Sequence, residues 1–194
     1  GRESHTWVHH IINNYDNLSD INIFLQGRID DLGCMAFMNP NEYLNHINKY
    51  GFVASRYGIL GPNHWDWNIG IENDPKYKKA WENNEISRSE IGFRKFAKNL
   101  FPGIPKFVTT SYGGCFAVKK DLIRSYDITF YKKLISLLNK SKNPIEGHYM
   151  ERLWCYMYTK NAPFLESIFD VIYTKFERSR FKNVYRFLKI IKLK

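Results

Sequence analysis

Apolar residues three and four positions apart predict several helices along this chain. The first begins after Ser4, a plausible N-cap, and its apolar positions are Trp7, Val8, Ile11, Ile12 and Tyr15. A second helix is expected between Asn39-Pro40 and Gly51, because proline favours the first turn of a helix and glycine the position after its end. Leu44 and Ile47 would then face inward.

Further helices are expected later in the chain. Ser87 and Glu90 form a capping-box pattern ahead of an apolar face that ends near Phe101, before Pro102-Gly103. Residues 130–139 predict another helix, and a third is expected to start at Gly147. A last helix is predicted over residues 181–193, where one side is apolar and another is basic.

Short continuous apolar runs predict strands between these helices. Ile21–Leu25 is the clearest, because it follows a turn-like segment and ends at Gln26-Gly27. Phe52–Ser55, Lys106–Thr110 and Cys115–Val118 are also expected to be strands. The segment "YGILGPNHWDWNIG" has no clean period and predicts a structured loop. Strands interleaved with helices indicate an α/β layer structure, in which sites gather at the carboxyl ends of the strands.

The composition supports one folded domain and limits the possible compartments. Of 194 residues, 44% are hydrophobic and 16% aromatic, which is enough for a buried core. The three cysteines show no CxxC spacing, which argues against a disulfide framework or a structural zinc site and favours a reducing compartment. No signal-like segment and no apolar run of about 18 residues is evident, so we expect a cytoplasmic protein.

Basic residues are concentrated toward the C-terminal end. The formal net charge is +10, and residues 175–194 carry eight basic side chains against one acidic side chain, Glu177. Residues 1–174 are therefore nearly balanced and are expected to form the main domain, which disfavours nucleic acid as a partner. The basic amphipathic segment 175–194 either contacts an anionic membrane peripherally, packs on the domain, or leads to a further domain.

Polar residues follow the strand predicted at Ile21–Leu25. Asp30 and Asp31 could ligate a hard divalent cation, Mn or Mg, that also binds the diphosphate of a nucleotide. Alternatively, the two acids only cap or solvate a turn. Gln26, Gly27 and Arg28 precede them and are candidate substrate contacts.

Two other segments carry candidate substrate contacts. The string "SYGG" places Tyr112 beside Gly113-Gly114, where the glycines either let the backbone approach a ligand or serve only a tight turn. Tyr112 could stack on a sugar or a base, or fill the core. Trp65, Asp66 and Trp67 resemble the lining of a carbohydrate site, although burial is the commoner fate of tryptophan.

The helix that starts near Gly147 carries the clearest candidates for acid–base chemistry. His148, Glu151, Arg152 and Cys155 would lie along one stripe, while Leu153, Trp154, Met157 and Tyr158 could face a core. Glu151 is the stronger candidate general base and His148 the weaker, with Arg152 fixing the position of the carboxylate. The alternative is an ion pair or an exposed polar face. Arg2, ahead of the first helix, could bind a phosphate together with backbone N–H groups.

Four strings, "GRESHTWVHHIINNYDNLSD", "IFLQG", "YGGCFAV" and "EGHYMERLW", occur in this order between Gly1 and Tyr158. Together they resemble a glycosyltransferase-like family of fungal, bacterial and viral proteins formerly of unknown function, with an element order like that of GT-A nucleotide-sugar transferases. The resemblance implies a mixed sheet flanked by helices. It also implies that the segment after Leu25 takes the place of the DxD metal motif, and that an acid on the "GHYMERLW" helix serves as base. The apolar strand that opens GT-A folds has no counterpart ahead of the first helix.

We therefore expect a glycosyltransferase that moves a sugar from a nucleotide-diphosphate donor to a glycan, glycoprotein or other hydroxyl acceptor. If the enzyme inverts, its base would be Glu151, with His148 the weaker candidate, and Asp30 and Asp31 would hold the metal. The alternative is a non-catalytic carbohydrate- or nucleotide-binding module. A basic nucleic-acid-binding protein is disfavoured by the balanced charge of residues 1–174.

Overall fold

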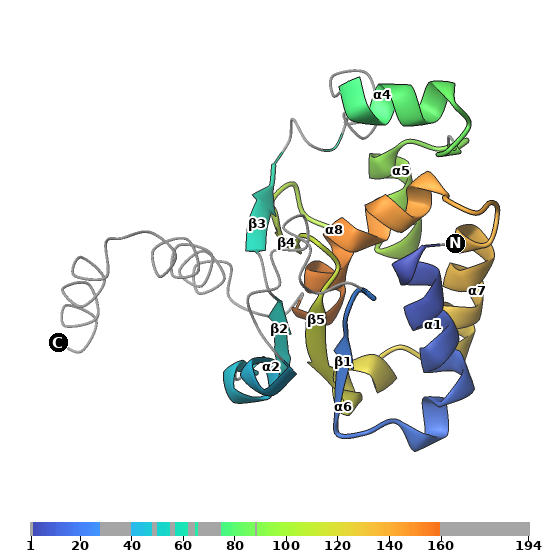
Figure 1. Cartoon of the computed structure of the whole chain (residues 1–194). Helices are drawn as coiled ribbons and strands as arrows, with labels where there is room; N and C mark the ends of the chain where they lie inside the picture. Colours follow the sequence, from blue (N-terminus) through green and yellow to red (C-terminus); the bar gives the residue numbers. More distant parts are fainter. Residues whose placement is uncertain are drawn as a thin grey trace, which may run out of the picture.

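A computed structural model describes residues 2–27, 40–47, 50–54, 57–61, 65, 75–87 and 89–159 of the chain (Figure 1). Its helices are α1 (Glu3–Asn13), η1 (Tyr15–Asn17), α2 (Pro40–His46), α4 (Pro75–Glu82), α5 (Phe93–Leu100), α6 (Lys120–Arg124), α7 (Ile128–Leu138) and α8 (Ile145–Thr159). Its strands are β1 (Ile21–Phe24), β2 (Phe52–Ala54), β3 (Tyr57–Leu60), β4 (Val108–Ser111) and β5 (Phe116–Lys119).

The strands form two small antiparallel sheets. β5 lies between β1 and β2, with Phe116 opposite both Phe24 and Ala54. β3 pairs with β4 in the second sheet. Strands and helices alternate as the sequence predicts, so the chain is a mixed α/β protein. All strand pairs in the described residues are antiparallel, whereas the resemblance implies a mixed sheet.

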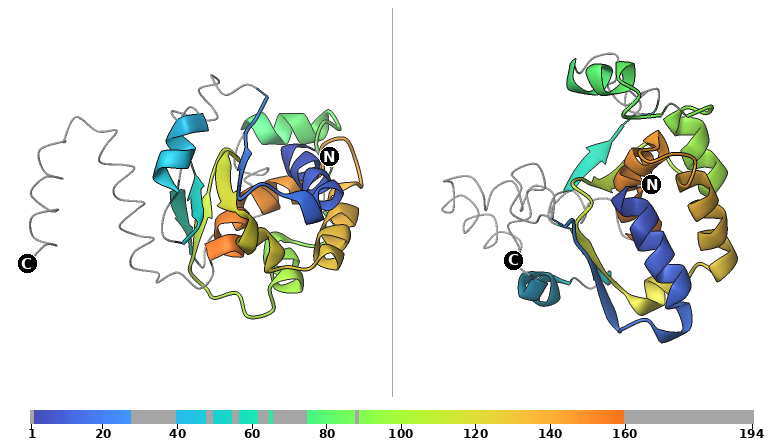
Figure 2. Two further views of the ribbon diagram at one scale, coloured as in Figure 1. Left: turned by 90° about the horizontal axis from the view of Figure 1, so that it is seen from below. Right: turned by 45° about the vertical axis from the view of Figure 1, so that its right-hand side comes forward.

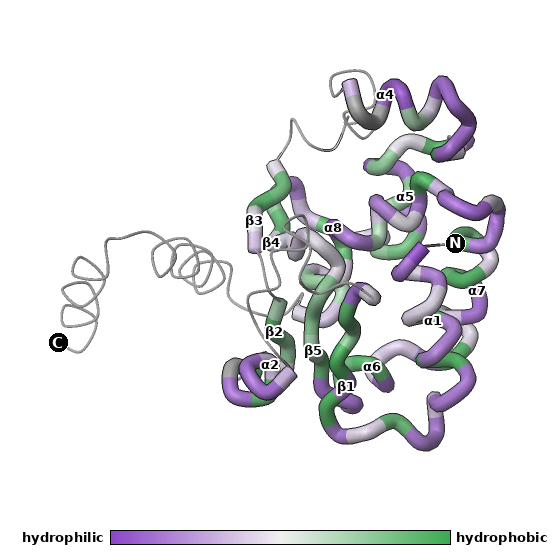
Figure 3. Tube along the Cα trace, viewed as in Figure 1, coloured by the Kyte–Doolittle hydropathy of each residue, from purple (hydrophilic) through white to green (hydrophobic). Residues whose placement is uncertain are grey.

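Helices cover both faces of the three-stranded sheet. Successive side chains of a strand point to opposite faces. Phe24, Phe52 and Phe116 accordingly face the large core under α1, α7 and α8, while Val53 and Ala117 face α2, where Tyr43 is fully buried. Figure 2 shows α2 on one side of the sheet and α1, α7 and α8 on the other. Strands β1 and β2 are mostly hydrophobic along the tube in Figure 3, whereas the helices alternate between hydrophilic and hydrophobic residues.

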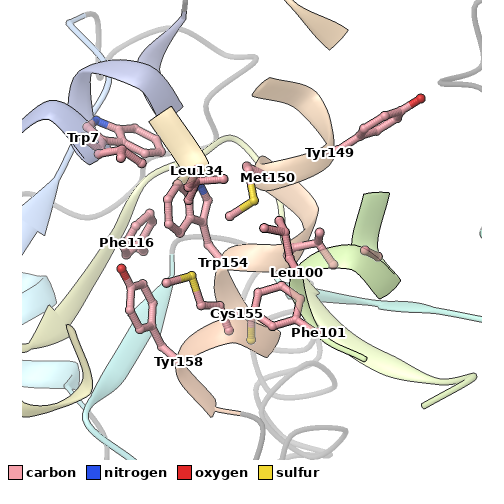
Figure 4. Packing of buried hydrophobic residues seen from close by; sticks show 14 of the residues in the cluster. Trp7, Leu100, Phe101, Phe116, Leu134, Tyr149, Met150, Trp154, Cys155 and Tyr158 are labelled. Carbon is pink, nitrogen blue, oxygen red and sulfur yellow. The ribbon is translucent and has the colours of Figure 1, made fainter. Parts of the chain in front are cut away.

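Helix α8 is the centre of the main core. It packs against β4, α5, α1 and α7, and most of its side chains are buried. The Trp154 ring lies 5.5 Å from the Phe116 ring, 6.1 Å from the Trp7 ring and 6.0 Å from the Tyr158 ring, measured between centroids (Figure 4). Truncating such a buried tryptophan costs about 3–5 kcal/mol, so this contact fixes α8 against the sheet and α1.

A bulge interrupts the ribbon formed by β2–β3 and β4–β5. Ala54 pairs with Phe116, and Tyr57 pairs with Ser111. Two residues therefore lie between β2 and β3, whereas four lie between β4 and β5. The two additional residues belong to Tyr112–Cys115, where Gly113 and Gly114 have φ values of 79° and 69°. Such left-handed backbone favours glycine, and an extra residue in one strand re-aims the chain locally. The "SYGG" string therefore encodes a bulge between two sheets.

Several predictions of element boundaries need correction. α1 begins at Glu3, and the Ser4 hydroxyl caps nothing in α1 but donates to the Gly147 carbonyl at 3.2 Å. α5 begins at Phe93, and its N-cap residue is Gly92. The capping box predicted at Ser87 and Glu90 therefore does not start this helix. Leu44, expected to face inward, is exposed.

The sequence predictions missed β3, α4 and the short helix α6, and one predicted helix lies outside the described residues. β3 and α4 occupy parts of the region where the sequence predicts a loop or gives no signal. The helix predicted at 181–193 is not among the residues that the structure describes. Among the described helices, none combines the length and the apolar run that a membrane crossing requires.

Candidate functional site

A polar pocket of about 300 Å³ lies where the start of α1, the segment just after β1, the bulge and the first half of α8 meet. The residues that line it are Arg2, Glu3, Ser4, Trp7, Gln26, Tyr112, Gly113, Gly114, Gly147, His148, Glu151 and Arg152. β1 ends at this place and β5 begins there, because the two strands are antiparallel. The pocket thus lies at the carboxyl end of β1, as the sequence predicts.

The helices α1 and α8 meet at their N-terminal turns. The first turn of α8 lies beside Arg2, and a Cβ atom placed on Gly147 would lie at an ordinary van der Waals distance, 4.0 Å, from the Arg2 Cβ. The Ser4 hydroxyl then reaches the Gly147 carbonyl. Two helix N-termini, each with the positive end of its dipole, therefore border one pocket.

Glu151 is fixed in the wall of this pocket. Its Oε1 accepts a hydrogen bond from the Gly113 backbone N–H at 2.9 Å, and its Oε2 lies 3.8 Å from Nδ1 of His148. Burial raises the pKa of this carboxyl, but the His148 imidazole, the Arg152 charge and the Gly113 N–H together outweigh burial and leave the pKa below its usual value. Glu151 is therefore ionised at neutral pH.

His148 lies between Glu151 and Arg2. Its Nε2 is 2.8 Å from Nη1 of Arg2, and the residue is 5% exposed. A guanidinium group only donates hydrogen bonds, so Nε2 must accept and the imidazole proton resides on Nδ1, the nitrogen nearer the Glu151 carboxylate. The three side chains form a row: Arg2 donates to Nε2 of the neutral His148, and Nδ1 of His148 lies toward the Glu151 carboxylate.

Arg152 closes another wall of the pocket. It is 7% exposed, its Nη1 donates to the His148 carbonyl at 2.8 Å, and its guanidinium carbon lies 5.8 Å from the centroid of the Tyr112 ring. Tyr112 in turn packs over Gly58 of β3, where a Cβ atom would come within 2.4 Å of the ring. Gly58 is thus a requirement of the site that the sequence analysis did not find.

The glycine pair of the bulge is held from several sides. Gln26 donates through Nε2 to the Gly113 carbonyl at 2.7 Å, opposite the bond from the Gly113 N–H to Glu151. A Cβ atom on Gly114 would come within 2.7 Å of the Trp7 ring. The glycines thus form the bulge and also bring backbone to the pocket, while a close approach to a ligand stays a prediction.

Comparison with known proteins places the chain in a family. The family described as "Protein of unknown function (DUF3431)" matches residues 1–170. The chain belongs to this family. No curated protein and no solved structure matches the chain. The DUF3431 match includes every residue of the pocket wall, whereas residues 171–194 extend beyond it.

In this DUF3431 chain the structure brings most of the predicted contacts into one pocket. Eight residues singled out from the sequence line it, namely Arg2, Gln26, Tyr112, Gly113, Gly114, His148, Glu151 and Arg152. They come from four segments that are far apart in the sequence. Gly27 adjoins the pocket through Gln26 but does not line it.

One predicted site residue, Trp65, and one residue of the predicted polar stripe, Cys155, are core residues. Trp65 is buried, stacks on Phe93 at 5.3 Å between centroids, and donates from Nε1 to the Lys106 carbonyl at 2.6 Å. It is absent from the pocket wall, so its interpretation as a sugar platform is replaced by a role in the core. Cys155, expected on the polar stripe of α8, is buried in the core as well.

The remaining predicted contacts lie outside the described residues, namely Arg28, Asp30, Asp31, Asp66 and Trp67. The metal prediction rests on Asp30 and Asp31 and stays a prediction. Within the described part of the chain, no group of three or more His, Cys, Asp or Glu side chains is placed to hold a metal ion.

Four further residues of the pocket wall were not predicted as site residues, namely Glu3, Ser4, Trp7 and Gly147, the last of which was expected only to open a helix. Glu3 lies 3.5 Å from the Arg2 guanidinium, measured between Oε2 and Nε. Ser4 and Trp7 were assigned to a cap and to the core. These residues line the pocket because the start of α1 contacts the start of α8, which is more than 140 residues away in the sequence.

Proposed function

We propose that this chain transfers a sugar from a nucleotide-diphosphate donor to a hydroxyl group of a glycan, glycoprotein or related acceptor. The observation that carries the proposal is the row Arg2, His148 and Glu151 in a pocket that also holds the Arg152 guanidinium. The resemblance to GT-A transferases extends over the strings that contribute these residues.

The pocket contains the two kinds of group that sugar transfer needs. The acceptor hydroxyl loses a proton as its oxygen attacks the anomeric carbon, and the diphosphate leaves with negative charge. The ionised Glu151 and the neutral His148 form an acid–base pair for the proton. Arg2 and Arg152 supply positive charge for the anionic donor, and Arg2 can bind phosphate oxygens through two N–H groups at once.

The sugar would lie against the polar wall made by Gln26 and the bulge. Tyr112 offers a ring face for stacking, and the Gly113 peptide is fixed on both sides. If Asp30 and Asp31 bind Mn or Mg, the ion would neutralise charge on the leaving diphosphate. The acceptor would approach His148 and Glu151 from the open side of the pocket.

A second candidate function is a non-catalytic module that binds nucleotides or carbohydrates. One observation favours it: the Glu151 carboxylate already accepts the Gly113 N–H, and its pKa is lowered, so it is a weaker proton acceptor than an ordinary glutamate. In that case the carboxylate would hold the bulge and the imidazole in place for binding only.

A thermal-shift panel of UDP- and GDP-sugars, with and without Mn, tests the proposal first. A ligand that binds only the native state raises the melting temperature by mass action. We expect one nucleotide sugar to stabilise the protein, and an Arg152→Gln variant to lose that shift. Lys98→Gln, which removes an exposed charge on α5 outside the pocket, is the matched control.

Turnover of the selected nucleotide sugar then separates the two functions. Release of the nucleoside diphosphate together with a glycosylated acceptor supports the transferase. Binding without turnover over a broad set of acceptors supports the module. Absence of any shift over the whole panel, with Mn present, contradicts both the transferase and a module that binds nucleotides.

A further inference from the structure

In the contact between Arg2 and His148, the Arg2 guanidinium occupies Nε2, the ring nitrogen of His148 that could accept a proton. Arg2 Nη1 lies 2.8 Å from Nε2, so the lone pair of Nε2 is engaged by a donor. The other ring nitrogen, Nδ1, carries the proton and lies toward Oε2 of Glu151 at 3.8 Å. In this arrangement His148 has the correct tautomer for a base, but its accepting atom is occupied.

The two partners in this contact differ in how firmly they are held. His148 is buried within the first turns of α8, and its backbone carbonyl accepts a hydrogen bond from Arg152. The Arg2 side chain is 41% exposed, and its contact with Glu3 is an ion pair between two partly exposed groups. Exposed ion pairs contribute little free energy. Arg2 is therefore the partner that can move, and His148 the partner that stays.

An anion in the pocket would compete for Arg2. Phosphate oxygens bind a guanidinium through two parallel, charge-assisted hydrogen bonds, which are stronger than a single hydrogen bond to a neutral imidazole. The pocket has room for such a group beside Arg2, and the N-terminal turns of α1 and α8 border it. The energetic preference thus favours the anion over Nε2 as the partner of Arg2.

We infer that Arg2 masks His148 in the ligand-free protein and that an anionic, diphosphate-type group unmasks Nε2 by drawing the guanidinium to itself. Arg2 is then a positioning residue that couples ligand binding to the exposure of a base. Binding of the anion therefore frees the Nε2 lone pair, so His148 can accept a proton only when the ligand is bound.

The inference deepens the proposed function, on which its catalytic consequence rests. The O–H bond of the acceptor breaks and its proton passes to Nε2, while the acceptor oxygen bonds to the anomeric carbon. The bond from that carbon to the diphosphate oxygen breaks, and the diphosphate leaves with the electron pair. His148 becomes an imidazolium beside the ionised Glu151, whose negative charge stabilises it.

The masking can be tested without any activity. Protein labelled with ¹⁵N-histidine gives separate ring-nitrogen resonances, and His148 is assigned from the signals missing in His148→Gln. We expect Nδ1 to be protonated in the ligand-free protein and Nε2 to be unprotonated but hydrogen-bonded. Inorganic pyrophosphate should move the Nε2 resonance toward its position in ligand-free Arg2→Ala.

The variants decide the outcome. Arg2→Ala should bind pyrophosphate about tenfold more weakly and show no further movement of Nε2 on saturation. Lys98→Gln, outside the pocket, should behave as the wild type. A proton on Nε2 in the free protein, no pyrophosphate binding, or an equal shift in Arg2→Ala would overturn the inference. Because the readout is spectroscopic, the shift can be present while sugar transfer is absent, which separates failure of the proposed function from failure of this inference.

Discussion

The backbone N–H of Gly113 donates a hydrogen bond to Oε1 of Glu151 over 2.9 Å. This bond joins the bulge between β4 and β5 to the second turn of α8. The Gly113 carbonyl is held in turn by Gln26, so the backbone of one residue connects the segment after β1, the bulge and the helix. The carboxylate that we assign to the acid–base pair is therefore positioned by the backbone of a sheet and not by its own helix alone.

The bulge should tolerate no side chain at Gly114. Gly114→Ala places a Cβ atom at 2.7 Å from the Trp7 ring and retains a φ of 69° that alanine disfavours. We expect the variant to lose about 1–3 kcal/mol of unfolding free energy, measured by urea denaturation. Gly103→Ala is the control, because a Cβ there meets nothing within 4 Å. Equal stability of the two variants would show that the bulge relaxes freely.

Gly58 should matter for ligand binding more than for stability. A Cβ atom at this position comes within 2.4 Å of the Tyr112 ring, which must then move away from Gly58. We expect Gly58→Ala to displace Tyr112 from the pocket wall and to weaken binding of the selected nucleotide sugar about tenfold in titration calorimetry. Unchanged affinity would exclude Tyr112 as part of the ligand platform.

Acidification should remove the stabilisation that Glu151 provides. The pKa of Glu151 in the folded protein lies below the ordinary value of 4.5, so its ionised form stabilises the native state above that pH. We expect wild type to exceed Glu151→Gln in unfolding free energy at neutral pH, and the difference to shrink as the pH falls from 4.5 through the lowered pKa. A constant difference across that window would contradict the lowered pKa.

Trp65 should behave as a core residue. Trp65→Phe keeps the stacking on Phe93 but removes the hydrogen bond to the Lys106 carbonyl. We expect a loss of about 1–3 kcal/mol in urea denaturation, because a part-buried hydrogen bond and part of the packing of a buried indole are lost. The affinity for the nucleotide sugar should stay at the wild-type value. A selective loss of affinity would restore Trp65 to the site.

Local patterns predict much of this fold and most of the described site. The apolar run at Ile21–Phe24, the glycine pair and the polar start of α8 each carry a signal within a few residues. Their meeting in one pocket depends on contacts between distant segments, such as the hydrogen bonds from Gln26 to Gly113 and from Gly113 to Glu151.

Other features depend on contacts that no local pattern contains. The capping role expected of Ser4 is replaced by a bond to Gly147, more than 140 residues away. Trp65 is buried because Phe93 and Lys106 surround it, although its neighbours in the sequence suggested a carbohydrate site. β3 lies in a segment for which the sequence predicts a loop, because that segment has no clean period, and the contact between Gly58 and the Tyr112 ring is not visible in the local pattern.

The central claim is that the pair of Glu151 and His148 performs chemistry in this pocket. Transfer from the selected nucleotide sugar, measured for wild type and for Glu151→Gln at equal donor occupancy, tests it most directly. Glutamine keeps an oxygen for the Gly113 N–H but removes the negative charge beside His148. The account predicts a fall in turnover of about 10²- to 10⁴-fold with donor binding retained. Turnover near that of the wild type in a folded Glu151→Gln protein would contradict it.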